Sequence, residues 1–121
     1  MLAAATADGP VYVDKQLVVM RTGKPLGLRF SGEIDITNSH AVGRSLAIAF
    51  PEDGHPHLDL TGLIFCDISG IRALVDAAES LGPNRRLMIH GLPQQIENVI
   101  RVTGWSERPS LILCDCEMNQ P

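Results

Sequence analysis

A serine hydroxyl lies in a short polar stretch of the sequence, Asp67-Ile68-Ser69-Gly70, between a strand-like run and a helical pattern. Residues 58–65 read as a strand, and apolar residues from Ile68 to Ala78 recur at the three- and four-residue steps of a helix. A hydroxyl at a helix start stands near backbone N–H groups that favour anions. By residue type alone, Ser69 is either the N-cap of this helix or a site for phosphorylation, which adds about −1.5 to −2 charges at pH 7.

A phosphate at this position would be tolerated by the helix and would change mainly the surface around it. The surface would become more anionic beside Asp35 and Asp67, and a partner docking there with apolar or acidic groups would be repelled. The sequence therefore predicts a switch by surface electrostatics that needs little refolding.

Catalytic interpretations of the same residues are poorly supported. The sequence has no G-x-S-x-G, G-x-x-x-x-G-K-[ST], G-x-G-x-x-G or H-E-x-x-H motif, and Ser69 has no histidine close in sequence. A distant histidine could still complete a spatial triad. Asp35, Asp59 and Asp67 could form a carboxylate cluster for a metal, but a helix-capping role for each is the plainer interpretation. We expect no enzyme, no metal and no cofactor.

Bulk composition indicates one ordinary globular domain. The 121 residues are 45% hydrophobic and 20% charged, and 10 basic against 14 acidic residues give a formal net charge of −4, which argues against nucleic-acid binding. No apolar run approaches the roughly 20 residues of a membrane span, and the N-terminus has no signal-peptide pattern, so a cytoplasmic protein is expected. Cys66, Cys114 and Cys116 do not suggest a disulfide framework, and packing as small hydrophobic residues is favoured over zinc binding.

The order of predicted elements indicates an α/β fold with a small, mostly parallel sheet. Strands are predicted at 11–13, 17–20, 26–34, 58–65, 86–90 and 111–114. The first three strand segments together are expected to form an N-terminal antiparallel pair. Three helices alternate with the later strands, which favours parallel strands joined by helical crossovers. We expect a mobile leader at 1–10, one domain at 11–116 and a tail at 117–121.

Helix boundaries are predicted from capping and periodicity. The first helix should begin after the polar run Asp35 to Asn38 and end before Pro51. The third should have Pro93 at its first position and Gly104 as its C-terminal cap. Its buried stripe is expected at Ile96, Val99, Ile100 and Thr103. His55 and His57 flank Pro56 and are interpreted as solvated loop residues.

Three segments together resemble the signature of STAS domains, and more specifically of the bacterial anti-sigma factor antagonists. They are Gly32-Glu33-Ile34-Asp35, the strand Leu58-Asp59-Leu60, and Phe65-Cys66-Asp67-Ile68-Ser69-Gly70-Ile71-Arg72-Ala73-Leu74. The resemblance runs in order over roughly residues 17 to 116, and the segment from Gly91 to Trp105 is similar to the family's last helix. The Asp-x-Ser-Gly-Ile sequence after a strand is the most specific part.

The resemblance implies a STAS fold with three to four helices on the sheet, and a partner-switching function. Such a protein binds an anti-sigma factor that is also a serine kinase, and so frees a sigma factor. Phosphorylation of the serine that matches Ser69 ends the interaction, and a metal-dependent serine phosphatase resets it. The resemblance further implies a partner-binding surface around the serine, made of Asp35, Thr37, Asn38, Asp67, Ile68, Gly70 and Arg72.

Departures from the family pattern leave alternatives open. Ile68 stands where the family often has a first serine, which leaves one hydroxyl, and Leu92 replaces a polar residue that often precedes the proline. Cys66 is expected to be buried, with a redox role as the alternative. The second function in view is a STAS-type sensory or scaffold module that binds a small ligand or a protein without phosphorylation. Exposed edges of a small sheet are also compatible with a homodimer.

Overall fold

The computed structural model describes residues 9–23 and 26–114, and the structural statements below refer to these ranges. Its elements follow in the order β1 (Pro10–Val13), β2 (Leu17–Gly23), β3 (Leu26–Ile34), α2 (Ser39–Ala49), β4 (His57–Cys66), α3 (Ile68–Glu79), β5 (Leu87–His90), α4 (Gln94–Thr103), η1 (Trp105–Glu107) and β6 (Leu111–Cys114). The expected tail, with Cys116 before it, lies outside the described residues. So does the expected leader, except for its last two residues, of which Pro10 opens β1.

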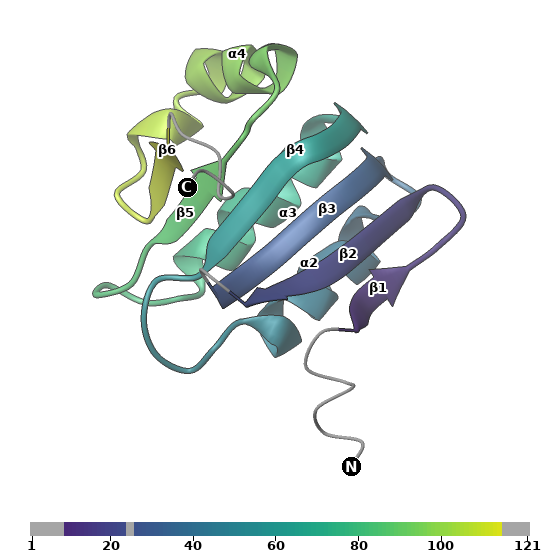
Figure 1. Ribbon diagram of the computed structural model, residues 1–121. Coiled ribbons are helices and arrows are strands. Elements are labelled where there is room, and N and C mark those ends of the chain that lie inside the picture. The colour runs from purple at the N-terminus through teal and green to yellow at the C-terminus, as the bar shows by residue number, and fades with distance from the viewer. Residues whose placement is uncertain (1–8, 24–25, 115–121) are drawn as a thin grey trace.

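The strands form one six-stranded sheet in the order β1-β2-β3-β4-β5-β6 within the described ranges (Figure 1). β1, β2 and β3 pair antiparallel, whereas β3, β4, β5 and β6 pair parallel. A parallel neighbour requires a crossover, and α2, α3 and α4 supply one between each pair of consecutive parallel strands. The predicted α/β fold with a mostly parallel sheet is confirmed.

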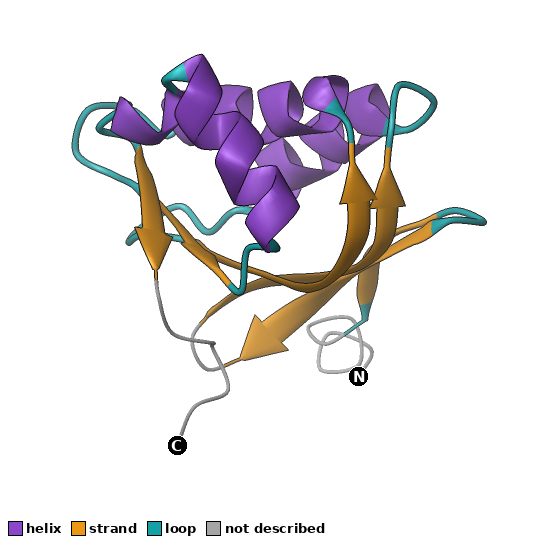
Figure 2. Ribbon diagram, turned by 90° about the horizontal axis from the view of Figure 1, so that it is seen from above, coloured by secondary structure: helices purple, strands orange, loops and turns teal. Residues whose placement is uncertain are grey.

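The core lies between the sheet and the helices, which Figure 2 shows on one side of the strands. β3 contributes Phe30 and Ile34, both 0% exposed, because alternate residues of a strand point to the same face. α3 contributes Ile71 and Leu74, each 1% exposed, at helical spacing. Full burial of such a side chain contributes about 1.5–3 kcal/mol, so these contacts hold the start of α3 against the strand ends.

Burial differs from the predicted stripes at three positions. Ile68 is 54% exposed because it is the first residue of α3 and precedes the part of the helix that packs on the sheet. In α4 the buried stripe is reduced to Ile96 and Ile100, while Val99 is 37% exposed and Thr103 lies at the surface.

The ends of α4 are set by a proline and a glycine. Pro93 occupies the N-cap position rather than the first helical position, since α4 begins one residue later. Gly104 adopts a left-handed backbone with φ 83° and caps the C-terminus as predicted. None of the helices in the described ranges is long and apolar enough to cross a membrane.

Candidate functional site

The turn from β4 into α3 is closed by the carboxylate of Asp67. Its Oδ1 accepts hydrogen bonds from the Gly70 N–H at 3.1 Å and from the Ser69 hydroxyl at 2.5 Å. Asp67 is therefore the N-cap of α3, as its predicted capping role required. The interpretation of Ser69 as the N-cap is wrong, because Ser69 is the second residue of α3 and donates its hydroxyl proton to the capping carboxylate.

Gly70 allows the first turn of α3 to lie directly on the ends of β3 and β4. A Cβ atom at this position would lie 2.6 Å from Cys66 Sγ and 2.7 Å from Ile34 Cγ2, which is closer than Cβ atoms approach other atoms. The Asp67 N–H also donates to the Ile34 carbonyl at 3.1 Å. Ser69 is thus held at a defined place relative to the two central strands.

The loop from β3 to α2 is folded around two polar side chains. The Asp35 carboxylate accepts from the Thr37 hydroxyl and, at 2.9 Å, from the Thr37 N–H. These two hydrogen bonds hold the pKa of Asp35 below its usual range. Asn38 is 3% exposed, and its side-chain carboxamide makes three hydrogen bonds of 2.9–3.1 Å. Its oxygen accepts from the Asp35 N–H, and its nitrogen donates to the Glu33 carbonyl and to the Asp14 carboxylate.

This arrangement leaves α2 without a side-chain cap. Asn38 stands at the N-cap position, but its side chain makes no capping hydrogen bond to the helix. The predicted capping of the first helix by the Asp35 to Asn38 run is therefore wrong, because the polar side chains of this run bond within the loop.

Two exposed isoleucines flank the turn at the carboxyl ends of β3 and β4. The parallel register pairs Ile34 with Cys66, so Ile36 and Ile68, each two residues further on, lie at the same edge of the sheet. Ile36 is 74% exposed and Ile68 is 54% exposed. Large apolar side chains left in water are typical of a surface that contacts a partner.

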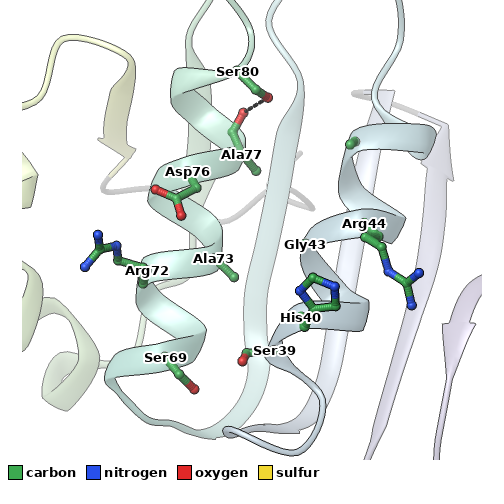
Figure 3. A pocket seen from close by; sticks show the side chains of 11 residues that line it. Ser39, His40, Gly43, Arg44, Ser69, Arg72, Ala73, Asp76, Ala77 and Ser80 are labelled. Carbon is green, nitrogen blue, oxygen red and sulfur yellow. Dashed lines mark hydrogen bonds between the residues drawn. The ribbon is translucent and has the colours of Figure 1, made fainter.

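A groove of about 430 Å³ runs between α2 and α3 and has Ser69 at one end (Figure 3). Its charged and titratable residues are His40 and Arg44 on α2, and Arg72 and Asp76 on α3. It is lined by Ser39, His40, Gly43, Arg44, Ala47, Ser69, Arg72, Ala73, Asp76, Ala77 and Ser80. The groove joins the two helices that begin beside the phosphorylatable serine of the sequence prediction.

The structure gathers the predicted site residues at one end of the molecule but divides them by exposure. Ile68, Thr37 and Arg72 are exposed, and Asp35 and Asp67 are half-buried. Asn38 and Gly70 are buried, so neither presents a side chain to solvent. Among the described residues, the exposed members are those available to a partner.

Ser39 also belongs to this end of the groove and was not predicted as a site residue. It is 7% exposed and is the first residue of α2. The sequence gives little indication of this role, because Ser39 only extends the polar run Thr37-Asn38. Whether Ser39 faces solvent or a groove depends on where the helix begins.

Cys66 precedes the turn, and the ionisation of its thiol is disfavoured. Burial, and to a smaller extent the neighbouring Asp67 carboxylate, raises the pKa of the Cys66 thiol to about 12. The thiolate that redox chemistry requires is therefore scarce at neutral pH, which favours the packing interpretation.

The remaining polar residues singled out in the sequence lie in β4 or in the loop before it. Asp59 is 3% exposed and pairs with Arg29 at 2.9 Å, and no cluster of three or more metal-ligating side chains occurs within the described ranges. The interpretation of His57 as a solvated loop residue is wrong, because β4 begins at His57 and its Nδ1 lies 2.7 Å from His90 Nε2 with the rings stacked. His55 is exposed and accepts the Arg86 N–H.

Comparisons with known proteins agree with this architecture. The family model described as "Mlab, STAS domain" matches residues 17–113. A crystal structure of an anti-sigma factor antagonist from Mycobacterium paratuberculosis superposes with a TM-score of 0.62 over 83% of this chain and 88% of that chain, at 19% sequence identity. At that identity the likeness concerns the fold, and the predicted fold class is confirmed. Curated proteins give no match.

Proposed function

The chain belongs to the STAS domain family, and on that premise we propose that it is an anti-sigma factor antagonist switched off by phosphorylation of Ser69. In its unmodified form it binds an anti-sigma factor that is also a serine kinase, and this binding frees a sigma factor. The kinase transfers the γ-phosphoryl group of ATP to the Ser69 oxygen, with release of ADP and the hydroxyl proton. A metal-dependent serine phosphatase returns the protein to the binding form. The proposal places the protein in the cytoplasm.

The observation that carries the proposal is the position of the Ser69 hydroxyl. It lies in the first turn of α3, where it is half-buried, donates to the Asp67 carboxylate and follows the exposed Ile68, and the exposed Ile36 lies at the same edge of the sheet. A partner that covers Ile36 and Ile68 gains apolar contact and must also cover the hydroxyl. Binding and phosphorylation therefore use the same surface, as a switch requires.

Phosphorylation alters this surface strongly. The Ser69 oxygen now donates to Asp67 Oδ1 at 2.5 Å, and as a phosphate ester it has no proton left to donate. The attached group adds about −1.5 to −2 charges at neutral pH. Two unit charges 4 Å apart repel by about 1 kcal/mol in water and about 4 kcal/mol near a protein surface. When a partner excludes water from this patch, the repulsion takes the larger of these two values. The phosphorylated protein therefore loses affinity for the partner.

The supporting residues explain why the fold survives the modification. Asp67 still accepts the Gly70 amide, and Gly70 still packs on Ile34 and Cys66. A negative group in the first turn of a helix is also compatible with the helix dipole. In the proposal, Asn38 and Gly70 act as supports, while Asp35, Thr37, Asp67, Ile68 and Arg72 contact the kinase.

The direct test is incubation with the cognate kinase and ATP, followed by intact-mass and site-resolved mass spectrometry. The proposal predicts one added phosphate, on Ser69, in the wild-type chain and none in Ser69→Ala. Ser80→Ala is the matched control, because it removes another hydroxyl of the same groove and should still be phosphorylated. An active kinase that leaves Ser69 unmodified would contradict the proposal and favour the STAS-type sensory or scaffold module.

A second experiment separates switching from folding. Ser69→Asp should lose kinase binding while its melting temperature stays within a few degrees of the wild type. Retained binding by a folded Ser69→Asp variant, together with retained binding by the enzymatically phosphorylated chain, would contradict the electrostatic switch.

A further inference from the structure

The start of α2 is an uncapped helix terminus that opens into the Ser69 end of the groove. α2 spans eleven residues, and the side chain of its N-cap residue, Asn38, makes no capping hydrogen bond. The start of α3 differs, because Asp67 already accepts the Gly70 N–H there. The first amides of a helix attract anions when no side chain caps them. The Ser39 N–H already donates to the Asp35 carbonyl, so the His40 and Ala41 N–H groups are the donors that remain at the start of α2.

Ser39 adds an independent donor at the same place. The residue is 7% exposed and lines the groove, and within the described residues no hydrogen bond involves its hydroxyl. Figure 3 shows this hydroxyl directed toward α3, at the end of the groove where Ser69 lies. Because this hydroxyl faces the open groove, it is available to donate to an acceptor that enters there.

A phosphoryl group on Ser69 would be driven toward these donors. It cannot keep the hydrogen bond to Asp67, and the Asp67 carboxylate repels it. The groove side offers the Ser39 hydroxyl and the start of α2. His40 and Arg44 of α2 and Arg72 and Asp76 of α3 also line the groove, and Figure 3 shows the guanidinium groups of both arginines turned away from it.

We propose that Ser39 and the first turn of α2 form a receiving site for the phosphoryl group of phosphorylated Ser69. The ligand is a phosphate monoester dianion supplied by this chain itself, and the inference rests on the proposed phosphorylation of Ser69. The phosphorylated form then has an ordered phosphate that bridges α3 to α2, in addition to the repulsion that it exerts on a partner. Ser39 acts as a positioning residue for that phosphate.

The test uses the full chain with phosphoserine installed at position 69 during translation, so that no kinase is involved. ³¹P NMR titration measures the second ionisation of the phosphoserine in the folded protein and in a peptide covering residues 64–74. Hydrogen bonds to the dianion favour it, so we expect a lower pKa in the protein than in the peptide. Ser39→Ala should raise that pKa by about 0.5 pH unit, as expected for loss of one hydrogen bond to the charged form. Ser80→Ala, at the opposite end of the groove, should leave it unchanged.

A second measurement does not depend on the Ser39 substitution. Comparison of ¹⁵N–¹H spectra should show the amide protons of His40 and Ala41 shifted downfield in the phosphoserine chain relative to the unmodified chain. The proposal is overturned if the phosphoserine pKa equals or exceeds that of the peptide, or if these amides do not shift. It is also overturned if a folded Ser39→Ala chain titrates like the wild type.

These outcomes are distinct from failure of the proposed function. A kinase that does not modify Ser69 leaves the phosphoserine titration unaffected. Conversely, a phosphate that ignores Ser39 leaves the loss of kinase binding as it was.

Discussion

The same substitution, glycine to alanine, should have opposite effects on stability at two helical positions. Gly70 lies in the first turn of α3, and Gly43 lies within α2. An added Cβ at Gly70 meets Cys66 Sγ at 2.6 Å and Ile34 Cγ2 at 2.7 Å. An added Cβ at Gly43 meets only Ala73 Cβ, at 3.9 Å, which is ordinary contact.

The magnitudes follow from two competing terms. Alanine is favoured over glycine inside a helix by about 0.5–1 kcal/mol, and less in the first turn. Overpacking a core contact costs about 1–3 kcal/mol. The Cys66 side chain can shift, but Ile34 is 0% exposed and has no room to move. Gly70→Ala should therefore lose about 1–2 kcal/mol of unfolding free energy, whereas Gly43→Ala should gain about 0.5–1 kcal/mol.

Urea unfolding followed by circular dichroism measures both changes, with the slope of the transition as the check on two-state behaviour. At about 4 °C per kcal/mol for a chain of this size, the melting temperatures should fall by about 4–8 °C for Gly70→Ala and rise by about 2–4 °C for Gly43→Ala. Adding Cys66→Ala to Gly70→Ala should recover part of the loss, because one of the two close contacts is removed. A Gly70→Ala chain as stable as the wild type would refute the close packing that positions Ser69.

Three further predictions concern single side chains. Asp67→Ala should cost about 1 kcal/mol in unfolding free energy because α3 loses its cap, and Asp67→Ser should restore most of it; equal stability of all three chains would contradict the capping role. Burial alone would raise the pKa of Asp59, but hydrogen bonds from Thr61 and Arg29 outweigh it and hold that pKa below its usual range. The contribution of the ionised Asp59 to stability is therefore present above about pH 4 and is lost as pH falls through the lower folded pKa. The wild type should be more stable than Asp59→Asn by about 1–3 kcal/mol of unfolding free energy, and urea titrations below pH 4 should show this difference narrowing. A difference that widens below pH 4 would contradict the ion pair. Cys66, with its thiol pKa raised to about 12, should react with iodoacetamide at pH 8 far more slowly in the folded chain than in urea, as site-resolved mass spectrometry would show; equal rates would contradict its burial.

The topology could be predicted because local patterns and a specific motif agreed. Alternation in β3, helical spacing after Ile68 and glycine at the end of α4 each correspond to an observed element. The motif around Ser69 added the family, which periodicity alone does not supply. Such agreement between local preference and overall fold is typical of natural sequences.

Side-chain roles at helix starts could not be predicted with the same accuracy. Asp67 and Ser69 are both short and polar, and only the backbone of the turn decides which of them caps α3. At α2 the carboxamide of Asn38 bonds Asp14, which is distant in sequence, so propensity for the N-cap position did not predict its bonds. The absence of a side-chain cap on α2 follows from that long-range contact.

Contacts across the sheet could not be predicted from the sequence, for a similar reason. His57 and His90 are far apart in the chain, and their ring contact depends on the parallel register of β4 with β5. The sequence pattern predicts a strand from Leu58, whereas β4 begins one residue earlier, and this difference assigns His57 to the loop. The exposure of Ile68, likewise, depends on where α3 begins to pack on the sheet.

The affinity of the anti-sigma kinase for the two forms of this chain tests the central claim most directly. Isothermal titration calorimetry in the presence of ADP would compare unmodified protein with protein that carries phosphoserine at position 69. A loss of about 3 kcal/mol, from the added charge in a patch that binding removes from water, corresponds to an affinity at least about 100-fold weaker. Equal affinities of the two folded forms would contradict the claim that Ser69 is the switch.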